Sequence, residues 1–238
     1  MPKVGTGNER TIFYHGTSLN GIRSGVVDLR HAGSGVGGNV LTLGDGFYMT
    51  SHKYAALLFS HLAEKKRCLM EAGIDPLKAI DNANAAGLGR LYEVALVEPQ
   101  LLDSASSISA QEAQELLGRA KLTPQTIDIY LRNKDKVGID ALSRIIEKEA
   151  SLAGNPYQYI TGSLGYDGLI CYERSWKYWD YYPSDLGLGV DRFAAVPLTI
   201  ALYNIDKVDS LQEVTASVKI NVLKAKPRPK KSKVRNRM

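Results

Sequence analysis

The chain has 238 residues, of which 44% are hydrophobic and 23% are charged, and its formal net charge is +5. This length and composition are typical of a folded domain with a sizeable core, and they exclude a disordered or fibrous chain. No long apolar run and no basic-then-apolar leader is present, so we expect no membrane contact, and either a cytoplasmic protein or one exported by a leaderless route.

Cysteine and charge set further expectations. The two cysteines, Cys68 and Cys171, predict free thiols in a reducing compartment and no metal site. Residues 224–238 hold eight Lys and Arg and no acid, which leaves about −3 on residues 1–223. We expect this basic tail to be disordered when free. It is either an arm that contacts RNA, DNA or an acidic partner, or a solubilising segment.

The first elements are predicted from hydrophobic periodicity. Residues 11–15 are a strand, and residues 18–26 form a helix that ends at Gly25. The glycine-rich range 31–46 is a loop that lacks the Gly-Lys-[Ser/Thr] of a phosphate-binding loop. Residues 47–73 begin as a strand and continue as a helix. Its apolar face consists of Ala55, Leu58, Phe59 and Leu62.

The second half begins with a strand at 89–99 that Pro99 closes. Ser109 and Glu112 form a capping box before a helix, and "TPQT" opens a second helix. A third helix, 139–154, is stopped by Gly154 and Pro156. Two strands follow at 165–173 and 198–208, with an edge strand at 214–223.

This order of elements predicts an α+β fold rather than a regular βαβ alternation. We expect a single domain over residues 1–223, interrupted by a helical insertion at about 103–155. Residues 224–238 form the separate basic tail.

Three stretches, taken together and in this order, resemble the NAD-binding core of the ADP-ribosyltransferase superfamily. The similarity is to the His-Tyr-Glu branch, which contains diphtheria-type toxins and poly(ADP-ribose) polymerases. The first stretch is "YHGTSLNGIRSGVVDLR" at 14–30, and the second is "GDGFYMTSHKYAALLF" at 44–59. The third is the strand pair "YEVAL" at 92–96 and "LTIALYNIDKV" at 198–208. The resemblance covers neither the insertion nor the tail.

The resemblance implies a split β-sheet core with flanking helices and NAD as co-substrate. By match to the family, a neutral or donor imidazole of His15 binds a ribose hydroxyl of the adenosine half. The Gly16 backbone pairs with the nicotinamide amide, and the Tyr48 ring packs on nicotinamide. Thr17 and Arg30 contact the amide and the adenosine or phosphate end. We expect His15 to bind the nucleotide if Tyr48 faces it across a cleft.

Thr199 stands where the family has its catalytic glutamate. That acid stabilises the positive charge that builds on the ribose as the nicotinamide bond breaks. Threonine can form a hydrogen bond but carries no charge, so the resemblance implies a mono-transferase or an inactive relative. A carboxylate from elsewhere would restore the charge, and the candidates near in sequence are Asp191, Asp206, Glu173 and Asp185.

We therefore predict a mono-ADP-ribosyltransferase that acts on a protein or an RNA. Bacterial effectors and toxins of this superfamily also carry foreign insertions, and a toxin would have a cognate inhibitor protein as partner. The basic tail and the aromatic stretch 172–183 favour RNA as the acceptor. Three alternatives stay open: an inactive protein that binds NAD or ADP-ribose, an RNA-binding protein without an NAD site, and an NAD hydrolase.

Overall fold

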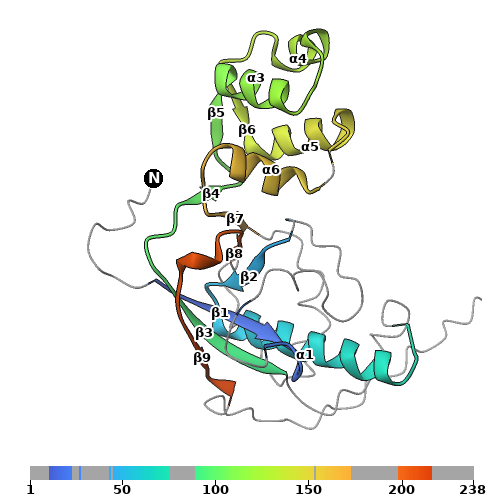
Figure 1. Cartoon of the computed structure of the whole chain (residues 1–238), viewed down its shortest axis with the longest axis vertical. Coiled ribbons are helices and arrows are strands. Elements are labelled where there is room, and N and C mark those ends of the chain that lie inside the picture. Colours follow the sequence, from blue (N-terminus) through green and yellow to red (C-terminus); the bar gives the residue numbers. More distant parts are fainter. Residues whose placement is uncertain are drawn as a thin grey trace, which may run out of the picture.

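The fold is α+β, as the sequence predicts. The structure, a computed structural model, describes residues 11–22, 27, 43, 45–75, 89–152, 154–172 and 198–215. A curled seven-stranded sheet carries one long helix, and a group of shorter helices projects beyond one edge of the sheet (Figure 1). Within the described residues, none of the helices has the length and apolarity needed to cross a bilayer. Arg30, Asp191 and the basic tail lie outside these residues.

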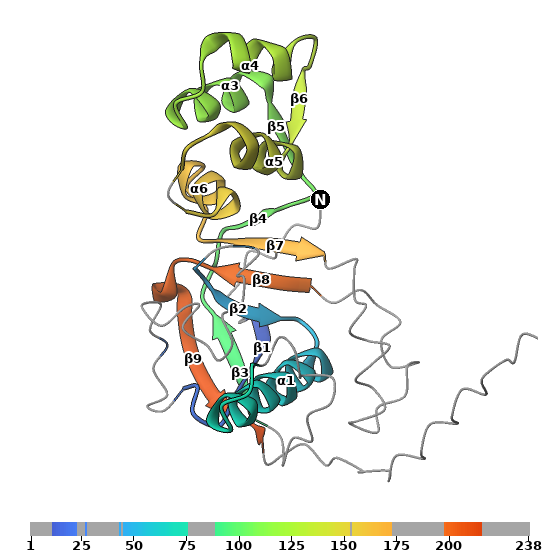
Figure 2. The same cartoon turned by 90° about the vertical axis from the view of Figure 1, so that its right-hand side faces the viewer.

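The sheet is mostly antiparallel. Its strands are β1 (Thr11–Thr17), β2 (Phe47–Thr50), β3 (Arg90–Leu96), β4 (Leu101–Asp103), β7 (Gly168–Tyr172), β8 (Leu198–Leu202) and β9 (Val208–Glu213). They follow the order β4-β7-β8-β2-β1-β3-β9, in which only β4 and β7 are parallel neighbours. Figure 2 shows β7, β8 and β2 on the side of the short helices, with β9 at the far edge.

The sheet is weakest between β1 and β2. The register of these two strands contains the single pair Tyr14–Thr50. By contrast, β1 pairs with β3 along its whole length, and β2 pairs with β8 along its whole length. We call this junction the β1–β2 seam. It divides the sheet into the halves β4-β7-β8-β2 and β1-β3-β9.

The long helix α1 (Lys53–Glu71) packs directly on β1 and β3. A Cβ atom added at Gly16 would lie 1.8 Å from the carbonyl oxygen of Ala56, and one added at Gly89 would lie 1.9 Å from that of Thr17. Both positions therefore need glycine because backbone meets backbone there. Leu57 and Leu91 complete this contact.

The predicted packing face of this helix is wrong in part. Phe59, assigned to the apolar face, is 36% exposed, whereas the polar Ser60 and Glu64 are buried. The small residues Ala56 and Ser60 face the sheet because the helix approaches the glycine positions closely. Ser60 satisfies its hydroxyl by donating to the Leu57 carbonyl at 2.7 Å.

The projecting helices lie between β4 and β7. The elements of this segment are β5 (Ser107–Ser109), α3 (Ala110–Arg119), α4 (Pro124–Leu131), β6 (Lys136–Gly138), α5 (Ile139–Glu149) and α6 (Pro156–Ser163). The capping box of α3 is confirmed, since Ser109 accepts from the Glu112 N–H and Glu112 accepts from the Ser109 N–H. Thr123 caps α4 in one direction, since its hydroxyl accepts from the Thr126 N–H. β5 and β6 form a separate antiparallel ladder.

The third predicted helix ends earlier than expected. α5 stops at Glu149, and Ala150 already has an extended backbone. Pro156, interpreted as a stop, instead begins α6, with Asn155 as the cap that accepts from the Tyr157 N–H at 2.9 Å. Proline suits the first turn because its missing N–H would have no partner there.

The described part of the predicted helix at 18–26 is a turn. Gly21 donates its N–H to Ser18 O at 3.0 Å, and the Ile22 carbonyl accepts from Tyr92 Oη and Arg90 Nη1. These long-range contacts tie the Ile22 carbonyl to β3. Residues 23–26 lie outside the described part.

The end of the sheet also differs from the prediction. β8 stops at Leu202 because Tyr203 and Asn204 both donate their N–H groups to the Asp167 carbonyl, which turns the chain. The 3₁₀ helix η4 (Ile205–Lys207) follows, and β9 forms the edge strand next to β3. The edge strand expected at 214–223 starts beyond β9, and residues 216–223 lie outside the described part.

Two hydrophobic clusters cover the two faces of the sheet. One joins the projecting helices to the sheet, through Ile160 of α6, Leu169 of β7 and Ala201 of β8. The other lies on the opposite face and includes Phe13, Phe47, Met49, Val94 and Ile200. We call the side of the sheet that carries the first cluster the helix face, because α1 and α6 both lie on it. The side that carries the second cluster is the far face.

Candidate functional site

His15 bridges the β1–β2 seam. Its Nδ1 lies 2.6 Å from the carbonyl oxygen of Tyr48, and its ring centroid lies 4.5 Å from that of Phe47. A carbonyl can only accept, so Nδ1 carries the hydrogen and Nε2 of the neutral ring is an acceptor. Burial lowers the pKa of His15 from 6.5 to about 4, although the hydrogen bond to Tyr48 opposes this shift. The imidazole is therefore neutral at physiological pH.

The backbone of Gly16 faces the same seam. Ser51 donates its N–H to β8, so the preceding residue, Thr50, directs its backbone groups toward β1, where it pairs with Tyr14. Backbone direction repeats every second residue in a strand. Tyr48 and Gly16 consequently direct their own N–H and C=O groups into the seam. The seam thus brings an imidazole acceptor close to a backbone donor and a backbone acceptor.

The glycine at position 16 has a structural explanation of its own. Its hydrogen faces α1, where a Cβ would collide with the Ala56 carbonyl. Helix packing therefore requires glycine whatever the seam binds. The ligand argument rests on the backbone groups of Gly16 and not on its missing side chain.

Tyr48 does not face His15 across a cleft, so the condition set for His15 as a nucleotide-binding residue is not met in that form. The paired residues Tyr14 and Thr50 share one face, so strand alternation places Tyr48 on that face and His15 on the other. The Tyr48 ring packs in the helix-face cluster, and its hydroxyl accepts from the Leu43 N–H at 3.0 Å. The two residues meet through the Tyr48 carbonyl because the two strands are neighbours.

Thr199 belongs to a cross-strand row on the helix face. The register aligns five residues from β7 to β3, in the order Cys171, Thr199, Thr50, Tyr14 and Glu93. Thr199 is 8% exposed, and its row neighbours are a thiol and a hydroxyl. Glu93 lies three strands away, about 14 Å at the usual strand spacing. This row therefore places no carboxylate beside Thr199.

The other predicted site residues are not all brought to the seam. Asp206 is exposed in η4, beyond the opposite end of β8 from Thr199. Thr17 ends β1 and packs against Gly21. Arg30 and Asp191 lie outside the described residues, as do the further candidates Glu173 and Asp185.

A contact that the sequence does not predict holds the Tyr48 hydroxyl in place. Tyr203 donates its hydroxyl to the Leu43 carbonyl, while the N–H of the same Leu43 binds Tyr48. Leu43 therefore lies between two tyrosines that are far apart in sequence. The strand motif at 198–208 includes an aromatic residue at position 203. No local pattern predicts that its hydroxyl binds the Leu43 carbonyl.

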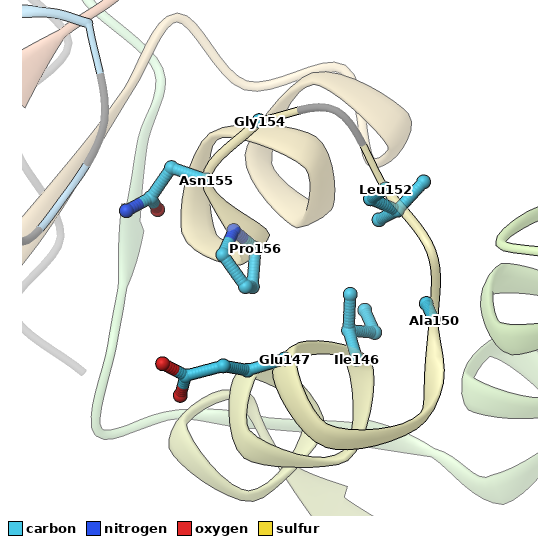
Figure 3. Close-up of a pocket in the computed structure, with 7 residues that line it drawn as sticks. All are labelled: Ile146, Glu147, Ala150, Leu152, Gly154, Asn155 and Pro156. Atoms are coloured by element: carbon cyan, nitrogen blue, oxygen red, sulfur yellow. The ribbon is translucent and has the colours of Figure 1, made fainter.

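The hollow in Figure 3 is separate from the seam. It has a volume of about 340 Å³ and lies between the end of α5 and the start of α6. Its lining residues are Ile146, Glu147, Ala150, Leu152, Gly154, Asn155 and Pro156. None of the predicted site residues that the structure describes lines it.

Comparison of the chain with protein-family models, curated proteins and solved structures found no match.

Proposed function

We propose that this chain is a mono-ADP-ribosyltransferase, which takes NAD as co-substrate and transfers ADP-ribose to a protein or an RNA. The observation that carries the proposal is the hydrogen bond from His15 Nδ1 to the Tyr48 carbonyl. It joins the His-Gly-Thr and Gly-Phe-Tyr motifs at one point of the sheet. It also leaves Nε2 as an acceptor that suits a ribose hydroxyl.

The chemistry fits the groups at the seam. The bond between ribose C1′ and the nicotinamide nitrogen breaks, its electron pair leaves with nicotinamide, and an acceptor nucleophile bonds to C1′ and loses its proton. A primary amide offers one acceptor and two donors, which complement the N–H and C=O of Gly16. A neutral His15 adds no second positive charge beside the ribose as its own charge develops.

The same proposal accounts for the divided sheet. The resemblance implies a split sheet, and at the β1–β2 seam the pairing reduces to the single pair Tyr14–Thr50. Because the side chains of His15 and Tyr48 lie on opposite faces of the sheet, they would contact different parts of NAD. The proposal assigns His15 to the adenosine ribose and Tyr48 to nicotinamide.

The surroundings of Thr199 favour a second candidate function. The carboxylate in its cross-strand row, Glu93, lies three strands away, so the row places no negative charge beside Thr199 to stabilise the developing cation. The second candidate is a protein that binds NAD or ADP-ribose at the same seam without transferring it.

The test is incubation of the purified protein with adenylate-labelled NAD and separate total-protein and total-RNA fractions. We expect label in one fraction and nicotinamide release from the wild type, and loss of both in His15→Ala and Tyr48→Ala. Tyr166→Ala, at a partly exposed position, is the matched control and should retain activity. Circular dichroism and thermal melting establish that each variant folds.

Each other outcome identifies a different function. NAD binding without nicotinamide release supports the inactive binding protein, and release of free ADP-ribose without label transfer supports an NAD hydrolase. Salt-sensitive RNA affinity that survives both site variants, with no NAD binding, supports an RNA-binding protein and contradicts an NAD site.

A further inference from the structure

The residues just before β2 are held by groups from distant parts of the chain. Leu43 donates its N–H to Tyr48 Oη at 3.0 Å, and its carbonyl accepts from the Tyr203 hydroxyl. Its side chain is buried in the helix-face cluster. Both polar groups of one peptide residue are therefore satisfied by tyrosines of β2 and of the turn after β8.

Two more contacts hold the same short segment. Asp45 donates its N–H to Gln158 Oε1 of α6 at 3.1 Å. A Cβ added at Gly46 would lie 3.1 Å from the ring of Tyr203, so this ring packs closely on the Gly46 backbone. Residues 43, 45 and 46 are thus anchored both by the turn after β8 and by a helix of the projecting group.

Tyr203 is suited to a constant donor role. Burial raises its pKa, as do the nearby hydroxyls of Tyr48 and Tyr157 and the thiol of Cys171. The hydroxyl therefore stays protonated throughout the physiological range. A donor that never ionises gives the Leu43 carbonyl a permanent partner.

We propose that Tyr203 and Gln158 are positioning residues for the NAD site, which they serve by holding the segment before β2 and, through Leu43, the ring of Tyr48. This inference rests on the proposed function and deepens it. It gives α6, and with it the projecting helices, a part in NAD recognition. The effect is large enough to measure because small displacements of binding groups cost much of their interaction energy.

The first experiment separates binding from chemistry. Tyr203→Phe keeps the ring on Gly46 but removes the donor to Leu43, and we expect the KM for NAD to rise by up to about tenfold, because the energy of one neutral hydrogen bond is the most that holding Tyr48 in place can supply. The value of kcat should change much less, because the Tyr48 contact forms equally in the ground state and the transition state.

The variants at Gln158 provide the rescue test. Gln158→Ala removes the acceptor for the Asp45 N–H and should also raise the KM, whereas Gln158→Glu keeps an oxygen acceptor and should restore it. Tyr130→Phe is the matched control, because it removes a hydroxyl bond to Glu149 far from the seam. An unchanged KM in both Tyr203→Phe and Gln158→Ala, in a wild type that uses NAD, overturns the inference.

Amide hydrogen exchange of the NAD-free protein tests the anchor directly. The Leu43 amide should exchange several-fold faster in Tyr203→Phe, although its own partner is Tyr48 and not Tyr203. It should keep its wild-type rate in Tyr130→Phe. Unchanged exchange in Tyr203→Phe also overturns the inference. If the wild type binds no NAD, the proposed function is wrong, and so is the role of Tyr203 in NAD binding. The Leu43 exchange rates still show whether Tyr203 holds the segment before β2, so the two failures can be distinguished.

Discussion

His15 is held in one protonation state by its position in the sheet. The ring is half-buried at the seam, and desolvation of its charged form lowers its pKa to about 4. The Tyr48 carbonyl orients Nδ1 and so determines which nitrogen accepts. A residue that is a pH switch in most settings is here a permanently neutral hydrogen-bonding group.

The pKa of His15 leads to a prediction about stability. The unfolded chain takes up a proton at this residue below about pH 6.5, while the folded chain resists it until about pH 4. The free energy of unfolding should therefore fall as the pH falls through this window, by up to about 3 kcal/mol and by less where water reaches the ring. Urea unfolding of wild type and His15→Gln measures the difference.

NMR provides the independent check on His15. Its ring proton should titrate with a midpoint near 4 in the folded protein. A midpoint at the ordinary value of 6.5, or equal pH dependence of the wild type and His15→Gln, would contradict the buried environment.

At the scale of elements, α1 shows why a periodic pattern predicts a helix more reliably than its packing face. The N-terminal caps and the apolar period are local, so the capped starts of α3 and α4 could be predicted, whereas the end of α5 could not. The face that α1 turns toward the sheet depends on where glycines in the sheet let the helix backbone approach. Gly16 and Gly89 are distant in sequence, and no local signal pairs them with Ala56 and Ser60.

Replacing glycine by alanine should have opposite effects at a buried close contact and at an exposed helix position. Gly16→Ala places a methyl group against the backbone of α1 and should destabilise the fold by more than about 3 kcal/mol. Gly118→Ala, in an exposed turn of α3 with no atom near its Cβ, should stabilise the fold by up to about 1 kcal/mol. Thermal melting of both variants checks this, and equal melting temperatures would refute the close contact.

At the scale of the whole molecule, the projecting helices and the sheet share one hydrophobic core. Figure 1 shows the helices beyond the β4 and β7 edge, yet the same cluster contains Leu116 of α3, Leu142 of α5 and Leu169 of β7. A segment that joins the core of its host in this way is expected to unfold together with it.

Cooperative unfolding can be tested from inside the projecting group. Leu142→Ala should cost about 2–5 kcal/mol and lower the stability of β2 and β8 as much as that of α5. Ile129→Ala, at a position that is 70% exposed, is the control and should change stability by less than about 0.5 kcal/mol. Hydrogen exchange reports each region, and a helical group that opens alone would contradict the shared core.

The candidate site was predictable in composition but not in geometry. The motifs around His15 and Tyr48 are short enough to recognise in sequence, and they form adjacent strands. Their opposite faces, and the link from Tyr203 through Leu43 to Tyr48, depend on register between segments that are far apart in the chain.

The sequence by itself determined the α+β class, the main strands and the capped helices, because these depend on residues within a few positions of one another. Tertiary structure alone decided that His15 meets the Tyr48 carbonyl, that α1 requires glycine at position 16, and that no carboxylate stands next to Thr199 in its row. The physical reason is that strand pairing sets register across tens of residues, and a shift of one residue would move every side chain to the other face.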